Sequence, residues 1–148
     1  LADGVISFVA SDHAPHTPEE KAQDIWSAPA GMVTIETMAP VLIDGVNRGR
    51  ISWNKLAEVL AEAPAKMFGL YPAKGSLEVG TDADITIVDP DIEYVMDQSK
   101  LHSRTKLSPF DGRHMKGKPV CTIVRGKTVM EDGQIKGDPS GRFIRPER

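Results

Sequence analysis

Side chains able to do acid–base or metal chemistry stand together near the start of the chain. Asp12, His13 and His16 lie in the run SDHAPHTPEEK at residues 11–21, directly after the apolar stretch 5–10. A carboxylate that follows a strand can bind a divalent metal ion and accept a proton from a metal-bound water. A charged imidazole can hold an anionic group of a substrate. The spacing makes Asp12 a candidate metal ligand and catalytic residue, and His16 a candidate substrate contact.

Simpler roles are open for the same residues. Asp12 could cap a turn or face solvent, and both histidines could be chance surface residues of a proline-rich loop. His13 points away from Asp12 if the backbone is extended, which favours packing over direct chemistry. The loop at Ala30 and Gly31 could bring bare backbone N–H and C=O groups to a ligand, or it could simply turn the chain.

The elements around these residues predict an α/β arrangement. The stretch 5–10 has the apolar character of a buried strand, and the prolines and charges of 11–31 indicate a loop. Apolar residues recur at steps of three and four over 34–46, which is typical of a helix face. Pro40 lies inside this pattern and predicts a kink or a break just before it, and Gly49 is placed to end the helix.

Further helical segments are predicted before the chain changes character near Tyr71. Ser52 is a good N-cap for a helix that carries Leu56, and Pro64 can begin a short helical piece that Gly69 ends.

After Tyr71 the sequence favours strands, with Asp132-Gly133 as a strong hairpin signal. The segment 91–118 is polar, and 137–148 is expected to be a surface tail. The predicted strands are 85–88, 120–124, 128–130 and 134–136.

Other titratable residues are expected to have no chemical role. Glu36 and Glu58 should solvate helix exteriors, and His102 and His114 should lie on the surface, because no partner stands at metal-ligand spacing. Cys121 is expected to pack as a small hydrophobe.

Composition restricts the partners. The chain has 148 residues, a net charge of −3 and a single cysteine. This charge gives no electrostatic reason to expect nucleic acid or a membrane surface, and no apolar run approaches the roughly 20 residues of a membrane span. The lone cysteine suits a reducing cytoplasm.

At these motifs the chain resembles the dihydroorotases of the amidohydrolase superfamily. The run 11–21 is similar to the motif of that family's eighth barrel strand, and it is the most specific part of the match. Ala28-Pro29-Ala30-Gly31, with the helix start at 35–40, looks like the substrate loop. Segments shared with cyclic amidohydrolases in general are 63–70, 74–77, 80–84, 108–112 and 124–126.

The resemblance implies a zinc hydrolase that opens a cyclic amide by attack of a hydroxide bridging two metal ions. It implies that Asp12 binds one metal and acts as general base and then acid, that His16 holds the substrate carboxylate, and that Ala30 and Gly31 give backbone contacts to the ring amide. The expected fold is the C-terminal part of a (β/α)8 TIM barrel over 1–70, followed by part of a β-sandwich over 71–148. The family's other metal ligands have no counterparts here and are expected upstream of Leu1.

Two departures leave alternatives open. The family usually has Asn at the place of Ala30, and often Gly at the place of Thr34. The larger Thr34 side chain could narrow the pocket. The tail, including Gly141 to Arg145, resembles a hydantoinase or dihydropyrimidinase at least as closely. A non-catalytic module that assembles through its β-rich half is a further hypothesis. We expect the 148 residues alone to be inactive. Because a severed barrel edge leaves unpaired backbone, we expect them to pair with another copy or a partner fragment, or to aggregate, and we expect a homo-oligomer.

Overall fold

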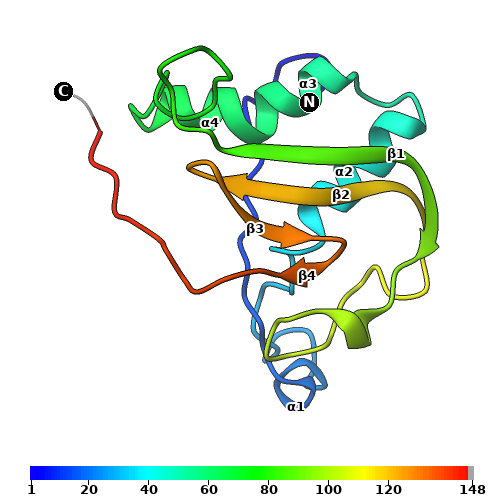
Figure 1. The fold of residues 1–148 in the computed structure, drawn as a ribbon. Coiled ribbons are helices and arrows are strands. Elements are labelled where there is room, and N and C mark those ends of the chain that lie inside the picture. The colour runs from blue at the N-terminus through cyan, green and yellow to red at the C-terminus, as the bar shows by residue number, and fades with distance from the viewer. Residues whose placement is uncertain (147–148) are drawn as a thin grey trace.

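An antiparallel sheet of four strands is the main element of the second half of the protein in the computed structural model, which describes residues 1–146 (Figure 1). The strands follow one another in sequence order across the sheet. They are β1 (Ile85–Val95), β2 (His114–Val124), β3 (Lys127–Glu131) and β4 (Gln134–Ile135).

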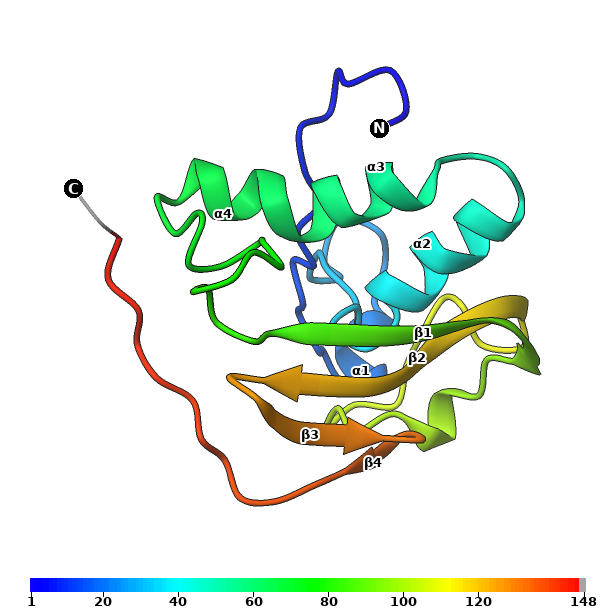
Figure 2. The same cartoon turned by 45° about the horizontal axis from the view of Figure 1, so that its top comes forward.

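The helices between residues 38 and 67 lie on one side of this sheet, as the rotated view in Figure 2 shows. No helix within 1–146 combines the length and the apolar character needed to cross a bilayer. The helices are α1 (Pro18–Lys21), α2 (Met38–Asn47), α3 (Trp53–Ala57), the π-helix η1 (Glu58–Glu62), α4 (Ala63–Met67) and, between β1 and β2, the 3-10 turn η2 (Gln98–Lys100).

The tight turns of the sheet agree with the sequence prediction. Arg125 and Gly126 join β2 to β3, and Asp132 and Gly133 join β3 to β4, all with positive φ of 46°, 76°, 48° and 79°. Positive φ at both central residues is the mark of a type I′ turn, whose twist matches that of the flanking strands. The hairpin predicted at Asp132-Gly133 is therefore confirmed.

Strands β1 and β2 extend well into the segment that the sequence indicated as a polar connection. The ladder between them shifts register around 87–88 and again between Asp89 and Glu93, so Pro90 falls in an irregular stretch rather than at the end of the strand. A bulge is where a sheet tolerates a proline, because the ladder there does not need its N–H. The Asn47 side chain bonds the carbonyl of Pro90 at 3.0 Å and fastens α2 to this bulge.

Helix α2 begins later than its apolar pattern predicted, and it does not break at Pro40. It starts at Met38, which puts Pro40 in the first turn, where the N–H has no partner within the helix anyway. The prediction of a kink was therefore wrong. Gly49, with φ of 70°, follows the C-cap Arg48 and ends the helix as expected.

The segments α3, η1 and α4 form one continuous helical run, where the sequence predicted two pieces separated at Pro64 (Figure 2). Ser52 caps the run as predicted, since its hydroxyl accepts the N–H of Lys55 at 3.1 Å. The π-helix bonds the N–H of Ala63 to the carbonyl of Glu58. In this pattern Val59 would receive the N–H of Pro64, which does not exist.

The N-terminal segment 5–10 uses the carbonyl that Pro64 leaves open. The N–H of Val9 donates to Val59 at 3.1 Å, and the ring of Phe8 meets that of Phe68 edge-on at 6.1 Å. The segment is nevertheless not a buried strand: Val5 is 87 % exposed, and no strand among residues 1–146 pairs with it. A strand exists only through its ladder, so the apolar run alone could not produce one here.

Contacts cross the boundary predicted at residue 71. A buried cluster joins Val33, from the first half, to Met96, Leu101 and Met115. Asp44 of α2 is 1 % exposed, and its carboxylate accepts hydrogen bonds from Arg48 at 2.7 Å, from Arg113 at 3.0 Å and from the N–H of Lys116 at 3.1 Å. The two halves of the chain are therefore joined by one polar joint, between α2 and β2, and by one apolar cluster. Whether 1–70 and 71–148 are separate domains stays a prediction.

Candidate functional site

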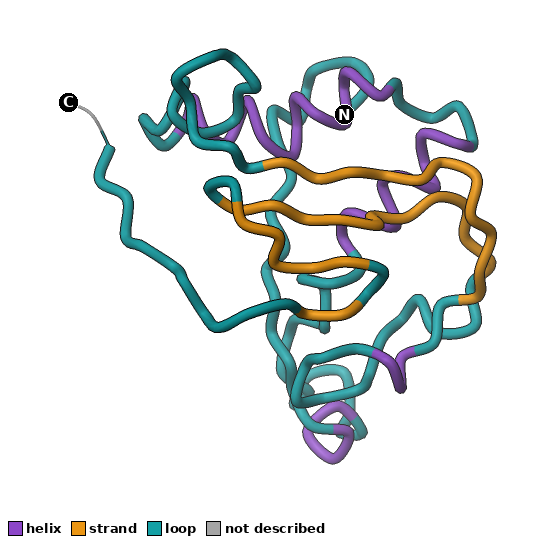
Figure 3. The backbone as a smooth tube through the Cα atoms, in the orientation of Figure 1, coloured by secondary structure: helices purple, strands orange, loops and turns teal. Residues whose placement is uncertain are grey.

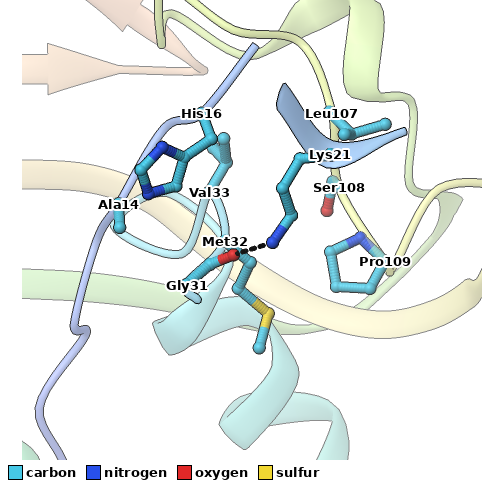
Figure 4. Close-up of a pocket in the computed structure, with 9 residues that line it drawn as sticks. All are labelled: Ala14, His16, Lys21, Gly31, Met32, Val33, Leu107, Ser108 and Pro109. Atoms are coloured by element: carbon cyan, nitrogen blue, oxygen red, sulfur yellow. Dashed lines mark hydrogen bonds between the residues drawn. The ribbon is translucent and has the colours of Figure 1, made fainter. Parts of the chain in front are cut away.

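His16 and Gly31, two of the predicted substrate contacts, line one cavity of about 380 Å³. Figure 4 shows the His16 ring on one side and the loop that carries Gly31 below it, with residues of the sheet half opposite. The complete lining is Ala14, His16, Lys21, Gly31, Met32, Val33, Leu107, Ser108 and Pro109. Ala30 and Asp12 are not part of this wall. Ala30 precedes the lining residue Gly31, and Asp12 stands two residues before the lining residue Ala14.

Two loop segments cross beneath the cavity and hold each other by backbone and side-chain hydrogen bonds. The N–H of Ala14 donates to Met32 at 3.0 Å, and His13 and Met32 form an isolated parallel bridge. The Nδ1 atom of His13 accepts the N–H groups of Thr34 at 3.1 Å and of Ile35 at 3.2 Å. An accepting Nδ1 places the proton of the neutral ring on Nε2. His13 therefore has the packing role that the sequence favoured.

Gly31 is required where these segments meet. Its φ is +100°, and a Cβ built on it would lie 2.4 Å from the Cβ of Ala14. No side chain fits at that distance, so glycine permits the close approach. Thr34, which could have narrowed the pocket, instead turns its hydroxyl to the carbonyl of Ser11 and is not part of the cavity wall.

Asp12 occupies the turn between the N-terminal segment and the cavity. It is exposed and has φ of +43°, a left-handed conformation that Asp tolerates better than most residues. Within residues 1–146 no group of three or more His, Cys, Asp or Glu side chains converges to hold a metal ion. The described residues therefore do not form a metal site by themselves, and Asp12 offers a single carboxylate.

The His16 ring is fixed by the short helix α1. Thr17 and Glu20 form a capping box: the Glu20 carboxylate accepts the N–H of Thr17 at 2.8 Å, and the Thr17 hydroxyl accepts the N–H of Glu20 at 3.3 Å. The same carboxylate oxygen lies 3.4 Å from Nδ1 of His16. This contact places a carboxylate beside the imidazole on the cavity wall.

His102 lies on the surface as predicted, but the prediction that Glu36 only solvates a helix exterior was wrong, because Glu36 is partly buried and pairs with His102. The Glu36 carboxylate, just before α2, accepts the N–H of His102 at 2.7 Å and of Ser103 at 3.0 Å, and lies 2.8 Å from Nδ1 of the His102 ring. Burial raises the pKa of Glu36, but the bonds from His102 and Ser103 outweigh it and hold this pKa below its ordinary 4.5.

This pair fastens the segment 101–109 against the first half, so that Leu107, Ser108 and Pro109 close one wall of the cavity. The Thr105 hydroxyl adds a bond of 3.4 Å to the carbonyl of Pro15. Sequence reasoning missed these residues because they lie far along the chain. The available signal was the match at 108–112 to cyclic amidohydrolases.

Lys21 is a further site residue that the spacing of the motif did not single out. It is partly buried on the cavity wall, and its ammonium donates to the carbonyl oxygens of Pro29 at 2.7 Å and Gly31 at 2.9 Å. Figure 4 shows the second of these bonds reaching across the cavity from α1 to the loop.

Comparisons with known proteins agree with this arrangement. The family model described as the amidohydrolase family matches residues 1–129. An L-hydantoinase of Paenarthrobacter aurescens is 46 % identical over 97 % of this chain and 32 % of its own length. A dihydroorotase of Halobacterium salinarum is 45 % identical over 98 % of this chain and 34 % of its own length.

A solved structure shares the fold. The L-hydantoinase (dihydropyrimidinase) from Arthrobacter aurescens superposes with a TM-score of 0.87 and 44 % identity, over 93 % of this chain and 31 % of that one. These matches define a cyclic amidohydrolase of the dihydroorotase and hydantoinase group. The chain belongs to the amidohydrolase family. It spans about a third of the length of the curated relatives it matches.

Proposed function

We propose that this chain is part of a metal-dependent cyclic amidohydrolase whose substrate is dihydroorotate, which it opens reversibly to carbamoyl aspartate. Residues 1–70 would supply the last strand and helices of a TIM barrel, and 71–148 part of a β-sandwich. The observation that carries the proposal is the convergence of His16 and the Gly31 loop on one cavity, directly after the turn that holds Asp12.

Each predicted residue has a role in this reaction. Asp12 takes a proton from the attacking water as its oxygen bonds the ring carbonyl carbon, and gives that proton to the ring nitrogen as the C–N bond breaks. Its carboxylate would be one ligand of a two-zinc centre, which would supply the activated water, and the other ligands would come from outside these 148 residues. His16 holds the substrate carboxylate, and the backbone at Ala30 and Gly31 meets the ring amide.

The choice of an anionic ring rests on His16. The half-buried ring lines the cavity, and its Nδ1 lies 3.4 Å from a Glu20 carboxylate oxygen. A ring N–H donor on the cavity wall suits a substrate that carries a carboxylate.

A second candidate is a hydantoinase or dihydropyrimidinase, which acts on a neutral ring. The likeness to an L-hydantoinase over nearly the whole chain supports it, as does the tail around Gly141 to Arg145.

The two candidates differ in which ring the full-length protein opens faster. We expect higher kcat/KM on dihydroorotate than on hydantoin, and faster turnover of hydantoin would reject the first choice. Opening of neither ring would favour a non-catalytic assembly module. We also expect the 148 residues alone to be inactive, which stoichiometric zinc binding with measurable ring opening by this chain would contradict. A cytoplasmic location and a homo-oligomeric state stay predictions.

A further inference from the structure

We propose that Lys21 is a positioning residue of the candidate site: its ammonium holds the 29–31 loop in register with His16. The inference rests on the proposed function, because it assigns Lys21 a part in presenting that loop to the cyclic amide. Whether Lys21 restrains the loop can be measured without any substrate.

The geometry of the contact carries the inference. Nζ of Lys21 donates to Pro29 at 2.7 Å and to Gly31 at 2.9 Å, so one cation holds carbonyls on both sides of Ala30. A partly buried ammonium needs such partners, because an unpaired one would lose its hydration without compensation. Bonds of this kind to a charged donor are stronger than bonds between neutral groups.

The two bonds orient the peptide groups of the loop. In a planar trans peptide the N–H points opposite to the carbonyl, so drawing the Pro29 carbonyl to Lys21 turns the N–H of Ala30 away from it. Within residues 1–146 no backbone group accepts that N–H. Lys21 thus determines the direction of a donor that the loop leaves available.

The stretch 29–31 itself has few other restraints. Its flanks are tied, by the N–H of Ala28 to the carbonyl of Asp24 at 2.8 Å and by the N–H of Ala14 to the carbonyl of Met32 at 3.0 Å. Between these two bonds, the hydrogen bonds that the backbone of 29–31 makes within the described residues are those from Lys21. Packing of Gly31 on Ala14 prevents closer approach but does not hold the loop in place. Loss of the ammonium would therefore release the segment 28–31.

Two adjacent residues of α1 contact His16 and the 29–31 loop, which are the predicted substrate contacts. Glu20 lies against the His16 ring, and the next residue, Lys21, bonds the loop. The capping box of Thr17 and Glu20 fixes the orientation of this turn. The relative placement of an imidazole and a backbone donor is consequently set by two adjacent side chains.

The first test uses the full-length protein and its Lys21→Met and Lys21→Arg variants. We expect Lys21→Met to lower kcat/KM about 100-fold, the order that a 1 Å misplacement costs, mainly through KM because the loop binds the substrate. Lys21→Arg, which keeps the charge and the donors, should restore most of the loss. A Lys21→Ala variant should regain activity with added propylamine. An unchanged KM in Lys21→Met would overturn the inference.

The second test measures amide hydrogen exchange of the same proteins without substrate. Lys21→Met should accelerate exchange in peptides that cover 28–33 and leave those of α2 unchanged, whereas Lys136→Met, which removes an exposed lysine of the sheet half, should change neither. Unaltered exchange at 28–33 would overturn the inference. A protein that opens no cyclic amide but shows the exchange effect would refute the proposed function alone.

Discussion

The segment that carries the candidate chemistry and the sheet that follows it are held together by different kinds of bond. In the tube of Figure 3 the first 37 residues are almost entirely loop, whereas 85–135 is largely strand. The loops are fixed by side chains that reach backbone groups, as His13, Lys21 and Glu36 do. The sheet is fixed by backbone ladders, which bulges interrupt at a few positions.

This difference predicts where single substitutions matter. A ladder shares its energy among many backbone bonds that no replacement other than by proline removes. A loop held by one carboxylate, ring or ammonium loses several bonds at once when that group is lost. Function-bearing loops on a rigid scaffold commonly have this character.

The largest expected effect is the loss of kcat when Asp12, in the loop segment, is replaced. In the full-length protein Asp12→Asn should lower kcat by about 10²–10⁴-fold, the usual contribution of a positioned acid–base group, with little change in substrate binding. Steady-state kinetics would measure this. Asp138→Asn, an exposed residue after the sheet, is the control. Near-normal turnover by Asp12→Asn would remove the residue from the mechanism.

The joint between the two regions should give the largest loss of stability. Asp44→Ala leaves Arg48 and Arg113 without their shared carboxylate and should lower the free energy of unfolding by about 3–5 kcal/mol. Urea denaturation at neutral pH would measure it. Asp91→Ala removes an exposed partner of Lys116 and should have almost no effect, and an equal loss in both variants would contradict a special role for the joint.

The stability of the contact between the 11–16 segment and the 29–31 loop should depend on the close approach of Gly31 to Ala14, and not on the φ of Gly31 alone. Gly31→Ala should cost about 1–3 kcal/mol more than Gly80→Ala, because only the first adds a steric clash to backbone strain. Gly80 is a matched control, with φ of +97° against +100° and nothing within 4 Å of a built Cβ. Equal losses in chemical denaturation would show that Ala14 can move aside.

The smallest loss of stability is expected when the bonds from Glu36 to the 101–109 segment are weakened. Glu36→Gln should lower stability by about 1–2 kcal/mol at pH 7, since it weakens hydrogen bonds to a charged group. The folded-state pKa of Glu36 is depressed, so its contribution is present above the unfolded pKa of roughly 4.3 and is lost as pH falls through the folded value.

Thermal unfolding from pH 7 to pH 3 would test this dependence. The difference between Glu36→Gln and the unaltered protein should shrink in acid, whereas Glu62→Gln, which breaks an exposed pair with Lys66, should show little difference at any pH. A gap that stays constant down to pH 3 would show that the carboxylate charge is not what holds the segment.

Local signals in the sequence predicted the elements that local chemistry decides. The Ser52 cap, the end of α2 at Gly49 and the Asp132-Gly133 turn depend on a few neighbouring residues, and all are as expected. The strand at 5–10 depends on partners elsewhere, so its apolar pattern was insufficient. The extent of β1 beyond Pro90 likewise depends on a bulge that no local pattern indicates.

The candidate site was predictable where its motif is contiguous. His16 and Gly31 line one cavity, and their role as substrate contacts stays a prediction. The wall from 107–109 and the pairing of Glu36 with His102 join positions far apart in the chain. Lys21 belongs to the motif, yet its role depends on where the 29–31 loop folds back. Sequence spacing identifies chemical groups and does not determine which distant backbone they meet.

Pro64 affects the path of the N-terminal segment, which is distant in the sequence. Because it offers no hydrogen, the acceptor on Val59 is available to Val9, and the entry segment that leads to Asp12 is anchored there. Any replacement that restores a hydrogen at 64 would compete for that acceptor. The tolerance of this helix to mutation is thus coupled to the path of the chain into the candidate site.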